Sequence, residues 1–196
     1  MLMVLMDPPA GLEAEFQDWY DMEHTPERAR ISGFLSASRW VCLDGWPRFM
    51  ACYDLETVDV LQQEAYRAIS GDNFSPWSRR ILPRAFGRER LILEEVTSGL
   101  GPLREESRGL ALLRFRGHRT DSLRTALDAL GLPAVCRLRL FLARGPGSEE
   151  SAVVIEAPAA ALIPSWRAEQ LAGCLESHAP DLLGVWRYTR YVRTSM

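Results

Sequence analysis

One order of expected elements occurs twice along the chain, and this repetition constrains the fold more than any other feature of the sequence. Apolar residues alternate at strand spacing and recur at helix spacing in the same succession of segments in each half. In the first half, the pattern predicts strand, helix, strand, strand, helix and strand over 1–6, 11–24, 33–43, 48–55, 57–69 and 86–96. In the second half, it predicts the same order over 110–116, 120–131, 135–143, 152–156, 164–176 and 184–192.

The order β-α-β-β-α-β is that of the ferredoxin-like unit, in which helices cover one face of an antiparallel sheet. The other face of such a sheet must also be covered. We therefore expect an α+β fold made of two tandem ferredoxin-like β-α-β-β-α-β repeats, whose open antiparallel sheets pack together within one chain. Residues 1–97 would form the first repeat and residues 109–196 the second. The segment 98–108, rich in Gly, Pro and charged residues, would be the linker.

The composition excludes several classes of function. The chain has 196 residues and a formal net charge of −3, so no general positive field would attract nucleic acid. All 23 basic residues are arginines, and the absence of lysine excludes a lysine Schiff base and a nucleotide-binding P-loop. The apolar opening from Met1 to Met6 is too short for a signal sequence or a membrane span. We therefore expect a cytoplasmic protein with no membrane partner.

The cysteines and histidines give no support for a metal site. No pair of histidines has the spacing of metal ligands on a helix, and we expect His118 and His178 to lie in loops. The four cysteines fit neither a zinc site nor a disulfide framework and are expected to be free thiols: Cys42, Cys52, Cys136 and Cys174. The sequence therefore predicts neither a bound metal nor a cofactor.

Residues 16–34 carry the run F-Q-D-W-Y-D-M-E-H-T-P-E-R-A-R-I-S-G-F, which includes the motif W-Y-D-M-E-H-T-P-E-R. This run resembles the EthD-like branch of the dimeric α/β-barrel superfamily, and the loop at 73–80 is similar to that of uncharacterised relatives. The motif resemblance covers 1–96, whereas the second half matches by order of elements only and lacks the His motif. The resemblance implies a tandem-repeat member with a dimeric α/β-barrel-type arrangement within one chain. It implies less about activity, since this superfamily includes monooxygenases, isomerases, cyclases and haem proteins.

His24 is the leading candidate for chemistry. Tyr20 and His24 are four residues apart and share one face of the expected helix, and Glu23 is the neighbour of His24 in the chain. We expect these three residues to be catalytic, with Tyr20 and Glu23 orienting or polarising the imidazole. If the helix breaks before Pro26, its dipole favours the protonated imidazole and suits an acid or base near neutral pH. The alternative is a structural histidine that caps the helix or packs at the sheet edge.

Arginines and aromatic residues indicate what a cavity would bind. Arg137 and Arg139 alternate with leucines, so one face of their strand is cationic and would point away from the helices. Arginines beside aromatic rings would suit an anionic aromatic molecule. The residues expected to bind ligand are Trp19, Arg28, Trp40, Tyr53, Trp77 and Arg79, with Trp186 and Tyr188 as further aromatic candidates. The alternative is that the strand arginines form ion pairs with Glu89, Glu94, Glu95 or Glu156 across the two halves.

We therefore expect a protein that binds a small organic molecule and, if it is an enzyme, uses cofactor-free acid/base chemistry at His24. Isomerase, cyclase, lyase and monooxygenase reactions all fit that outline. One alternative is a haem-binding α/β-barrel protein with His24 as the axial ligand. Another is a non-catalytic binding or assembly protein in which the motif only packs the halves together. The sequence leaves open a monomer with an intrachain pseudo-dimer or a homodimer.

Overall fold

The computed structural model of the chain describes residues 1–97, 99–117, 120, 123, 127, 130–145, 149–166, 171, 175 and 182–193. Its strands are β1 (Leu2–Asp7), β2 (Phe34–Cys42), β3 (Phe49–Leu55), β4 (Phe86–Glu95), β5 (Gly109–Arg116), β6 (Arg137–Arg144), β7 (Glu150–Ala157) and β8 (Leu182–Arg190). The helices expected over 120–131 and 164–176 fall largely outside the described residues, as do His118, His178 and Cys174.

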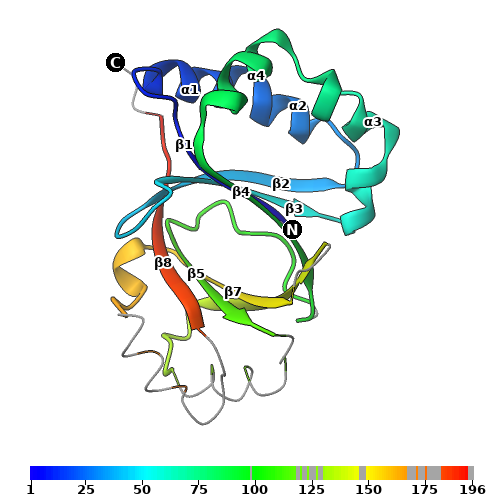
Figure 1. Ribbon diagram of the computed structural model, residues 1–196. Coiled ribbons are helices and arrows are strands. Elements are labelled where there is room, and N and C mark those ends of the chain that lie inside the picture. The colour runs from blue at the N-terminus through cyan, green and yellow to red at the C-terminus, as the bar shows by residue number, and fades with distance from the viewer. Residues whose placement is uncertain are drawn as a thin grey trace.

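The eight strands form one closed antiparallel barrel in the order β1-β3-β2-β8-β5-β7-β6-β4 (Figure 1). The expectation of two tandem ferredoxin-like repeats with separate sheets packed face to face is therefore wrong. Hydrogen bonding continues from β2 to β8, where Trp40 pairs with Arg190, and from β4 to β6, where Ile92 pairs with Arg144. An open sheet leaves unpaired N–H and C=O groups along its edges. Pairing the edges satisfies these groups, which packing the faces together would not do.

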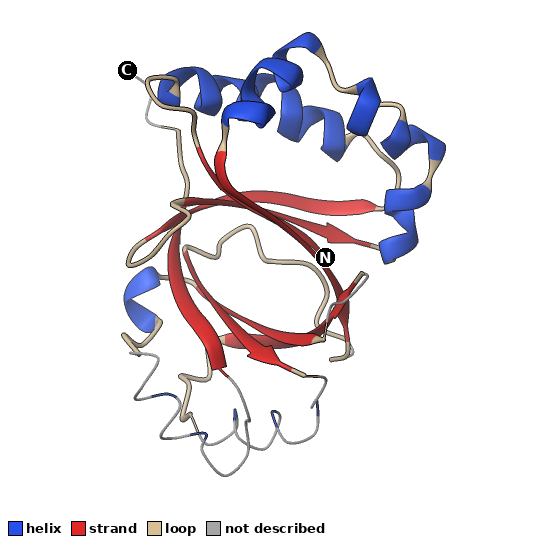
Figure 2. Ribbon diagram, viewed as in Figure 1, coloured by secondary structure: helices blue, strands red, loops and turns tan. Residues whose placement is uncertain are grey.

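Short helices cover the outer side of the first four strands (Figure 2). They are α1 (Glu13–Trp19), the π-helical turn η1 (Tyr20–His24), α2 (Thr25–Ala29), the 3-10 helix η2 (Val58–Gln62), α3 (Glu64–Arg67), η3 (Gly71–Asn73), α4 (Pro76–Ile81) and η4 (Leu82–Arg84). The single helix expected over 57–69 is thus divided into η2 and α3. One more 3-10 helix, η5 (Ala160–Leu162), follows β7. Among the described residues, no helix is long and apolar enough to cross a membrane.

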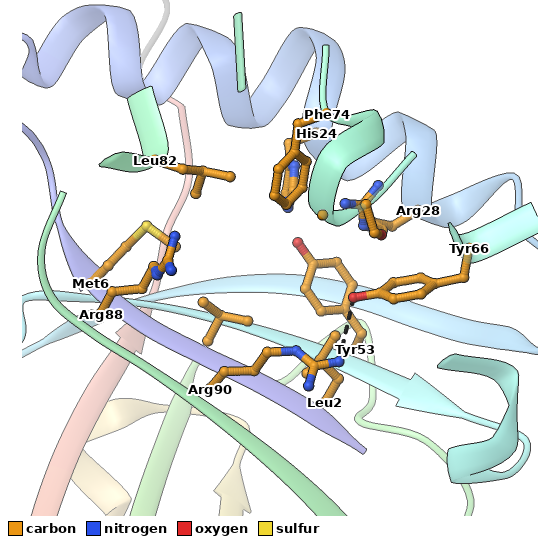
Figure 3. Close-up of a pocket in the computed structure, with 13 residues that line it drawn as sticks. Leu2, Met6, His24, Arg28, Tyr53, Tyr66, Phe74, Leu82, Arg88 and Arg90 are labelled. Carbon is orange, nitrogen blue, oxygen red and sulfur yellow. Dashed lines mark hydrogen bonds between the residues drawn. The ribbon is translucent and has the colours of Figure 1, made fainter. Parts of the chain in front are cut away.

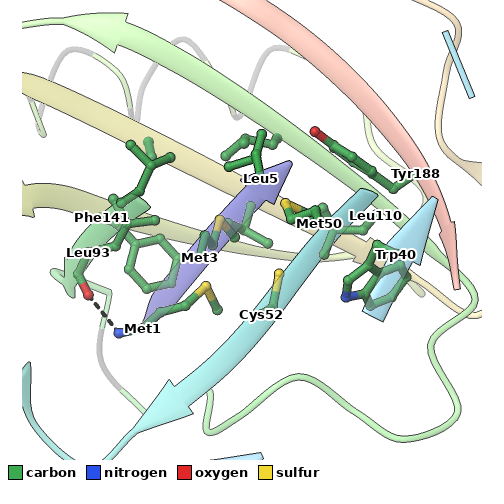
Figure 4. Close-up of a cluster of buried hydrophobic side chains, with 14 of the residues drawn as sticks. Met1, Met3, Leu5, Trp40, Met50, Cys52, Leu93, Leu110, Phe141 and Tyr188 are labelled. Carbon is green, nitrogen blue, oxygen red and sulfur yellow. Dashed lines mark hydrogen bonds between the residues drawn. The ribbon is translucent and has the colours of Figure 1, made fainter. Parts of the chain in front are cut away.

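Apolar side chains fill the inside of the barrel (Figure 4). Met3 and Leu5 point inward from β1 and pack with Trp40 and Tyr188, all four of them fully buried or nearly so. Because successive side chains of a strand face opposite sides, Leu2 and Met6 of β1 instead face outward and pack beneath the helices. The space for a ligand therefore has to be sought on the outer side of the sheet, between the strands and the helices.

Ion pairs connect strands from the two halves of the chain. Arg139 on β6 donates to Asp54 on β3 at 2.7 Å and to Glu95 on β4 at 2.6 Å. Arg114 on β5 pairs with Glu89 on β4 at 2.8 Å. The interpretation of strand arginines as partners in ion pairs across the two halves is confirmed for these residues and for the pair Arg144–Glu94. Arg137 instead pairs with Glu156 within the second half.

Candidate functional site

A continuous helical segment with a π-helical turn in its middle positions His24. α1, η1 and α2 follow one another without interruption from Glu13 to Ala29, and in η1 the Thr25 N–H donates to the Tyr20 carbonyl five residues earlier. The break expected before Pro26 is therefore absent from this described segment. The wider π turn accommodates Pro26, whose ring in a regular α-helix would meet the carbonyl four residues earlier. Such turns are frequent at functional sites.

His24 is buried, with only 8% of its surface exposed. The Trp19 ring centre lies 4.4 Å from that of His24, and the Tyr20 ring stands edge-on to the imidazole at 5.4 Å. Burial, together with the charges of Arg28 and Arg39, holds the pKa of His24 well below 6.5. The expectation that a helix end favours the protonated form is thus wrong, because the helix continues past His24. The imidazole is neutral at pH 7.

A pocket of about 500 Å³ opens beside His24, between the helices and the outer face of the barrel (Figure 3). Three of the residues predicted from the sequence line it: His24, Arg28 and Tyr53. Apolar residues of β1 contribute to the wall beneath them. The full lining is Leu2, Val4, Met6, His24, Arg28, Tyr53, Tyr66, Ser70, Gly71, Phe74, Leu82, Arg88 and Arg90.

The charged groups of this pocket are all positive. Arg28, Arg88 and Arg90 line it, and none of the described lining residues carries a carboxylate. Arg28 is 2% exposed, and its Nη2 donates to the Ile69 carbonyl at 3.1 Å. The nearest carboxylate oxygen to its Nη1 is Oε2 of Glu27, at 3.6 Å. The pocket thus presents a net positive charge to whatever enters it, with Glu27 partly compensating Arg28 from outside the lining.

Four buried polar atoms around the pocket have no hydrogen-bond partner among the described residues. They are His24 Nδ1, Arg28 Nη1, the Tyr53 hydroxyl and Ser70 Oγ. An unpaired buried polar group is costly, and native structures leave few of them. Burial also raises the pKa of Tyr53 far above its usual value of 10, so its hydroxyl keeps its proton and can donate it in a hydrogen bond. A bound molecule with acceptor oxygens would satisfy three of these four groups.

Glu23 and Trp19 instead belong to a contact between the helices. The Ser75 hydroxyl donates to Glu23 Oε1, and Trp19 Nε1 donates to Ser78 Oγ at 3.0 Å. Ser75 caps α4, because its Oγ accepts the Ser78 N–H at 2.9 Å. This network joins α1 and η1 to α4.

The structure places the other predicted residues outside the pocket. Tyr20 is fully buried against His24, and burial raises its pKa to about 12. Trp40 lies inside the barrel, Trp77 packs against the apolar layer beneath the helices, and the exposed Arg79 donates to the Asp72 carbonyl at 2.5 Å. The structure therefore brings His24, Arg28 and Tyr53 together at the pocket and leaves these four residues apart from it.

Sequence reasoning did not assign Tyr66, Ser70, Phe74, Arg88 and Arg90 to the site. The alternation of Arg88 and Arg90 on one face of their strand was a usable signal, since that face is the one under the helices. Tyr66 lies in α3, within the helix expected over 57–69, and Ser70 and Phe74 lie in the short segment that follows it. Only the packing of these segments over β1 brings them to the pocket.

Comparisons with known proteins support the fold. The chain matches no family model and no sequence of a curated protein. Solved structures are similar over nearly its whole length. A candidate monooxygenase from Lactobacillus acidophilus is 9% identical, with a TM-score of 0.57, over 96% of this chain and 92% of that chain. A heme-binding protein from Thermus thermophilus is 10% identical, with a TM-score of 0.59, over 96% and 90%. Chlorite dismutase from Candidatus Nitrospira defluvii is 12% identical, with a TM-score of 0.57, over 97% and 90%.

At these identities the likeness concerns the fold alone. These structures share the barrel fold with this chain. Membership of the dimeric α/β-barrel superfamily and of its EthD-like branch stays a prediction.

Proposed function

We propose that the protein binds a small organic anion in the pocket beside His24 and that His24 exchanges a proton with it without a cofactor. The observation that carries this proposal is the neutral, buried imidazole with an unpartnered Nδ1, set in a lining whose charged groups are all arginines. The planar guanidinium group of arginine donates paired hydrogen bonds to carboxylates and similar oxyanions. The EthD-like character of residues 16–34 is part of the same proposal.

The lining residues have two roles in the proposed chemistry: one accepts a proton and the others stabilise negative charge. A neutral imidazole can accept a proton from an acidic C–H or O–H group of the ligand. Arg28 Nη1 and the Tyr53 hydroxyl, both without hydrogen-bond partners in the described part of the chain, would stabilise the negative charge that develops. Isomerisation, cyclisation and elimination all begin with such a transfer. Oxidation of an electron-rich aromatic would begin in the same way and would require molecular oxygen as oxidant.

Tyr20 and Glu23 take positioning roles in this proposal. The edge-on contact of Tyr20 fixes the plane of the imidazole. Glu23 acts at a greater distance, because its bond with Ser75 holds α4 against the helical segment that carries His24. Neither residue would then exchange a proton with the ligand.

Native mass spectrometry of the purified protein, followed by denaturing release, tests the first half of the proposal and reports the oligomeric state. A stoichiometric organic anion is expected; if none is retained, benzoate is titrated as a probe and should bind saturably. If no anion is retained and benzoate does not bind, the binding proposal is wrong.

Proton exchange tests the second half of the proposal. The released compound, returned to ligand-free protein in D₂O, should gain deuterium with the wild type and not with His24→Gln. Equal exchange with both proteins would remove His24 as the proton carrier.

Haem is the second candidate ligand, favoured by the state of His24. Neutral imidazole is the form that ligates iron, and the buried Nδ1 has no partner among the described residues. His24 would hold the iron, and Arg88 and Arg90 would pair with the propionates. Bound haem would supply redox chemistry. Added haemin should then give a saturable Soret band that His24→Ala abolishes, and the absence of a saturable band would eliminate this candidate.

A further inference from the structure

We infer that the ligand of this pocket carries two anionic groups at opposite ends of an apolar body, as a small dicarboxylate does. This inference rests on the proposed function and narrows its ligand class. It follows from the positions of the three arginines, from the absence of carboxylate partners for two of them among the described residues, and from the apolar surface that lines the same pocket.

The arginines approach the pocket from two different walls. Arg28 projects from α2 in the helical layer, whereas Arg88 and Arg90 project from β4 (Figure 3). Leu91 and Leu93 of β4 point into the barrel, so alternation directs Arg88 and Arg90 to the outer face beneath the helices. One cation is therefore buried in the helical wall, and two cations stand on the exposed side of the strand wall.

Arg88 and Arg90 on β4 have no carboxylate partner among the described residues. Neither forms an ion pair with any described residue, and Arg90 donates a 3.5 Å hydrogen bond to the Tyr66 hydroxyl. By contrast, Arg114, Arg139 and Arg144 on β5 and β6 are each paired with glutamates of β4. On β4 itself, Glu89 and Glu94 are engaged by those arginines. Positive charge at this wall is thus left for a ligand to neutralise.

Apolar side chains line the same pocket as the arginines. Leu2, Val4 and Met6 form the outward face of β1, and Phe74 and Leu82 close the pocket from the helical side. A ligand with a single anionic group would pair with one arginine wall and leave the other unpaired. A ligand with an acid group at each end would pair with both walls while its apolar body covers β1.

Calorimetric titration with two matched pairs of probes tests this inference: benzoate against terephthalate, and hexanoate against adipate. Each pair shares a body and differs by one carboxylate. In at least one pair we expect the dianion to bind about tenfold more tightly than the monoanion, since a charge-assisted contact is gained. The double variant Arg88→Gln/Arg90→Gln should lose this preference and bind the dianion no more tightly than the monoanion. Both residues are exposed, so the variant should fold.

The double variant Arg79→Gln/Arg84→Gln is the matched control, because it removes the same charge from exposed arginines outside the pocket. It should retain the preference for the dianion. Loss of the preference in this control as well would show a general charge effect and overturn the inference. Equal binding of monoanion and dianion to the wild type would overturn the inference while leaving the proposed function in place. If none of the four probes binds, both this inference and the proposed function are wrong.

Discussion

Arg139 on β6 and Asp54 on β3 are joined by a 2.7 Å hydrogen-bonded ion pair inside the protein, although 85 residues separate them in the chain. Arg139 is 4% exposed and Asp54 is 2% exposed. Asp54 Oδ2 also accepts hydrogen bonds from Ser36 Oγ at 2.9 Å and from the Leu103 N–H at 2.8 Å. One carboxylate therefore ties strands from both halves to the segment that connects them.

Removal of this carboxylate should be strongly destabilising. Asp54→Ala leaves Arg139 buried with Glu95 as its one remaining carboxylate partner, and the free energy of unfolding should fall by roughly 3 kcal/mol or more. Glu94→Gln is the control, because the pair Glu94–Arg144 is about half exposed and should contribute less than about 1 kcal/mol. Urea unfolding measures both changes. Equal effects of the two substitutions would contradict the importance of burial.

The burial of His24 should make stability depend on pH. Its pKa is lowered in the folded protein, so as the pH falls below about 6.5 the unfolded chain takes up the proton first. The free energy of unfolding should therefore fall in that range, with a contribution from His24 that approaches about 1.4 kcal/mol per pH unit. His24→Gln should lack this contribution. Urea unfolding of both proteins at pH 7.5, 6.5 and 5.5 gives the difference, and parallel pH profiles would show that His24 titrates normally.

The variant His24→Gln also tests the alternative that His24 has only a structural role. If His24 only packs the helices, His24→Gln should lower stability at pH 7.5 without altering the affinity for an anionic probe. If the site binds ligand through His24, the affinity should change even where the variant remains folded. The two quantities, measured on one preparation by urea unfolding and calorimetric titration, separate these interpretations.

Tyr53 and Tyr188 provide a matched pair of tyrosines. Both hydroxyls are buried and lack a hydrogen-bond partner in the described part of the chain, but Tyr53 lines the pocket whereas Tyr188 lies inside the barrel. Tyr53→Phe should weaken the binding of an anionic ligand about fivefold to tenfold, since one donor is lost. Tyr188→Phe should leave that affinity unchanged. Neither variant should lose stability, because an unpaired buried hydroxyl contributes nothing favourable.

We expect Glu23 to stabilise the contact between the helices and not to contact the ligand. Glu23→Ala removes the acceptor of the Ser75 hydroxyl, and the free energy of unfolding should fall by about 1–2 kcal/mol. The affinity for a pocket ligand should change far less than in Arg28→Gln. Calorimetric titration of both variants with benzoate checks this order. A larger loss of affinity in Glu23→Ala than in Arg28→Gln would place Glu23 at the ligand after all.

Local pattern in the sequence determined the strands and part of the site. Alternation of arginines within 86–96 and 135–143 supported the assignment of those segments to strands, because side-chain direction has a period of two in a strand. The spacing of Tyr20 and His24 placed both rings on one helix face, and the structure bears this out through their edge-on contact. Arg28 follows four residues after His24 and, for the same reason, reaches the same pocket.

Tertiary structure alone decided how the strands join, where the pocket lies and in which protonation state His24 is held. The pairing of β2 with β8 and of β4 with β6 joins residues far apart in the chain, and no local pattern encodes which edges meet. Trp40 and Tyr53 are both aromatic strand residues, yet one fills the barrel and the other lines the pocket. The pKa of His24 depends on burial and on nearby arginines, one of them, Arg39, brought from β2. Each of these outcomes depends on contacts between distant segments, which only the closed barrel and its covering helices create.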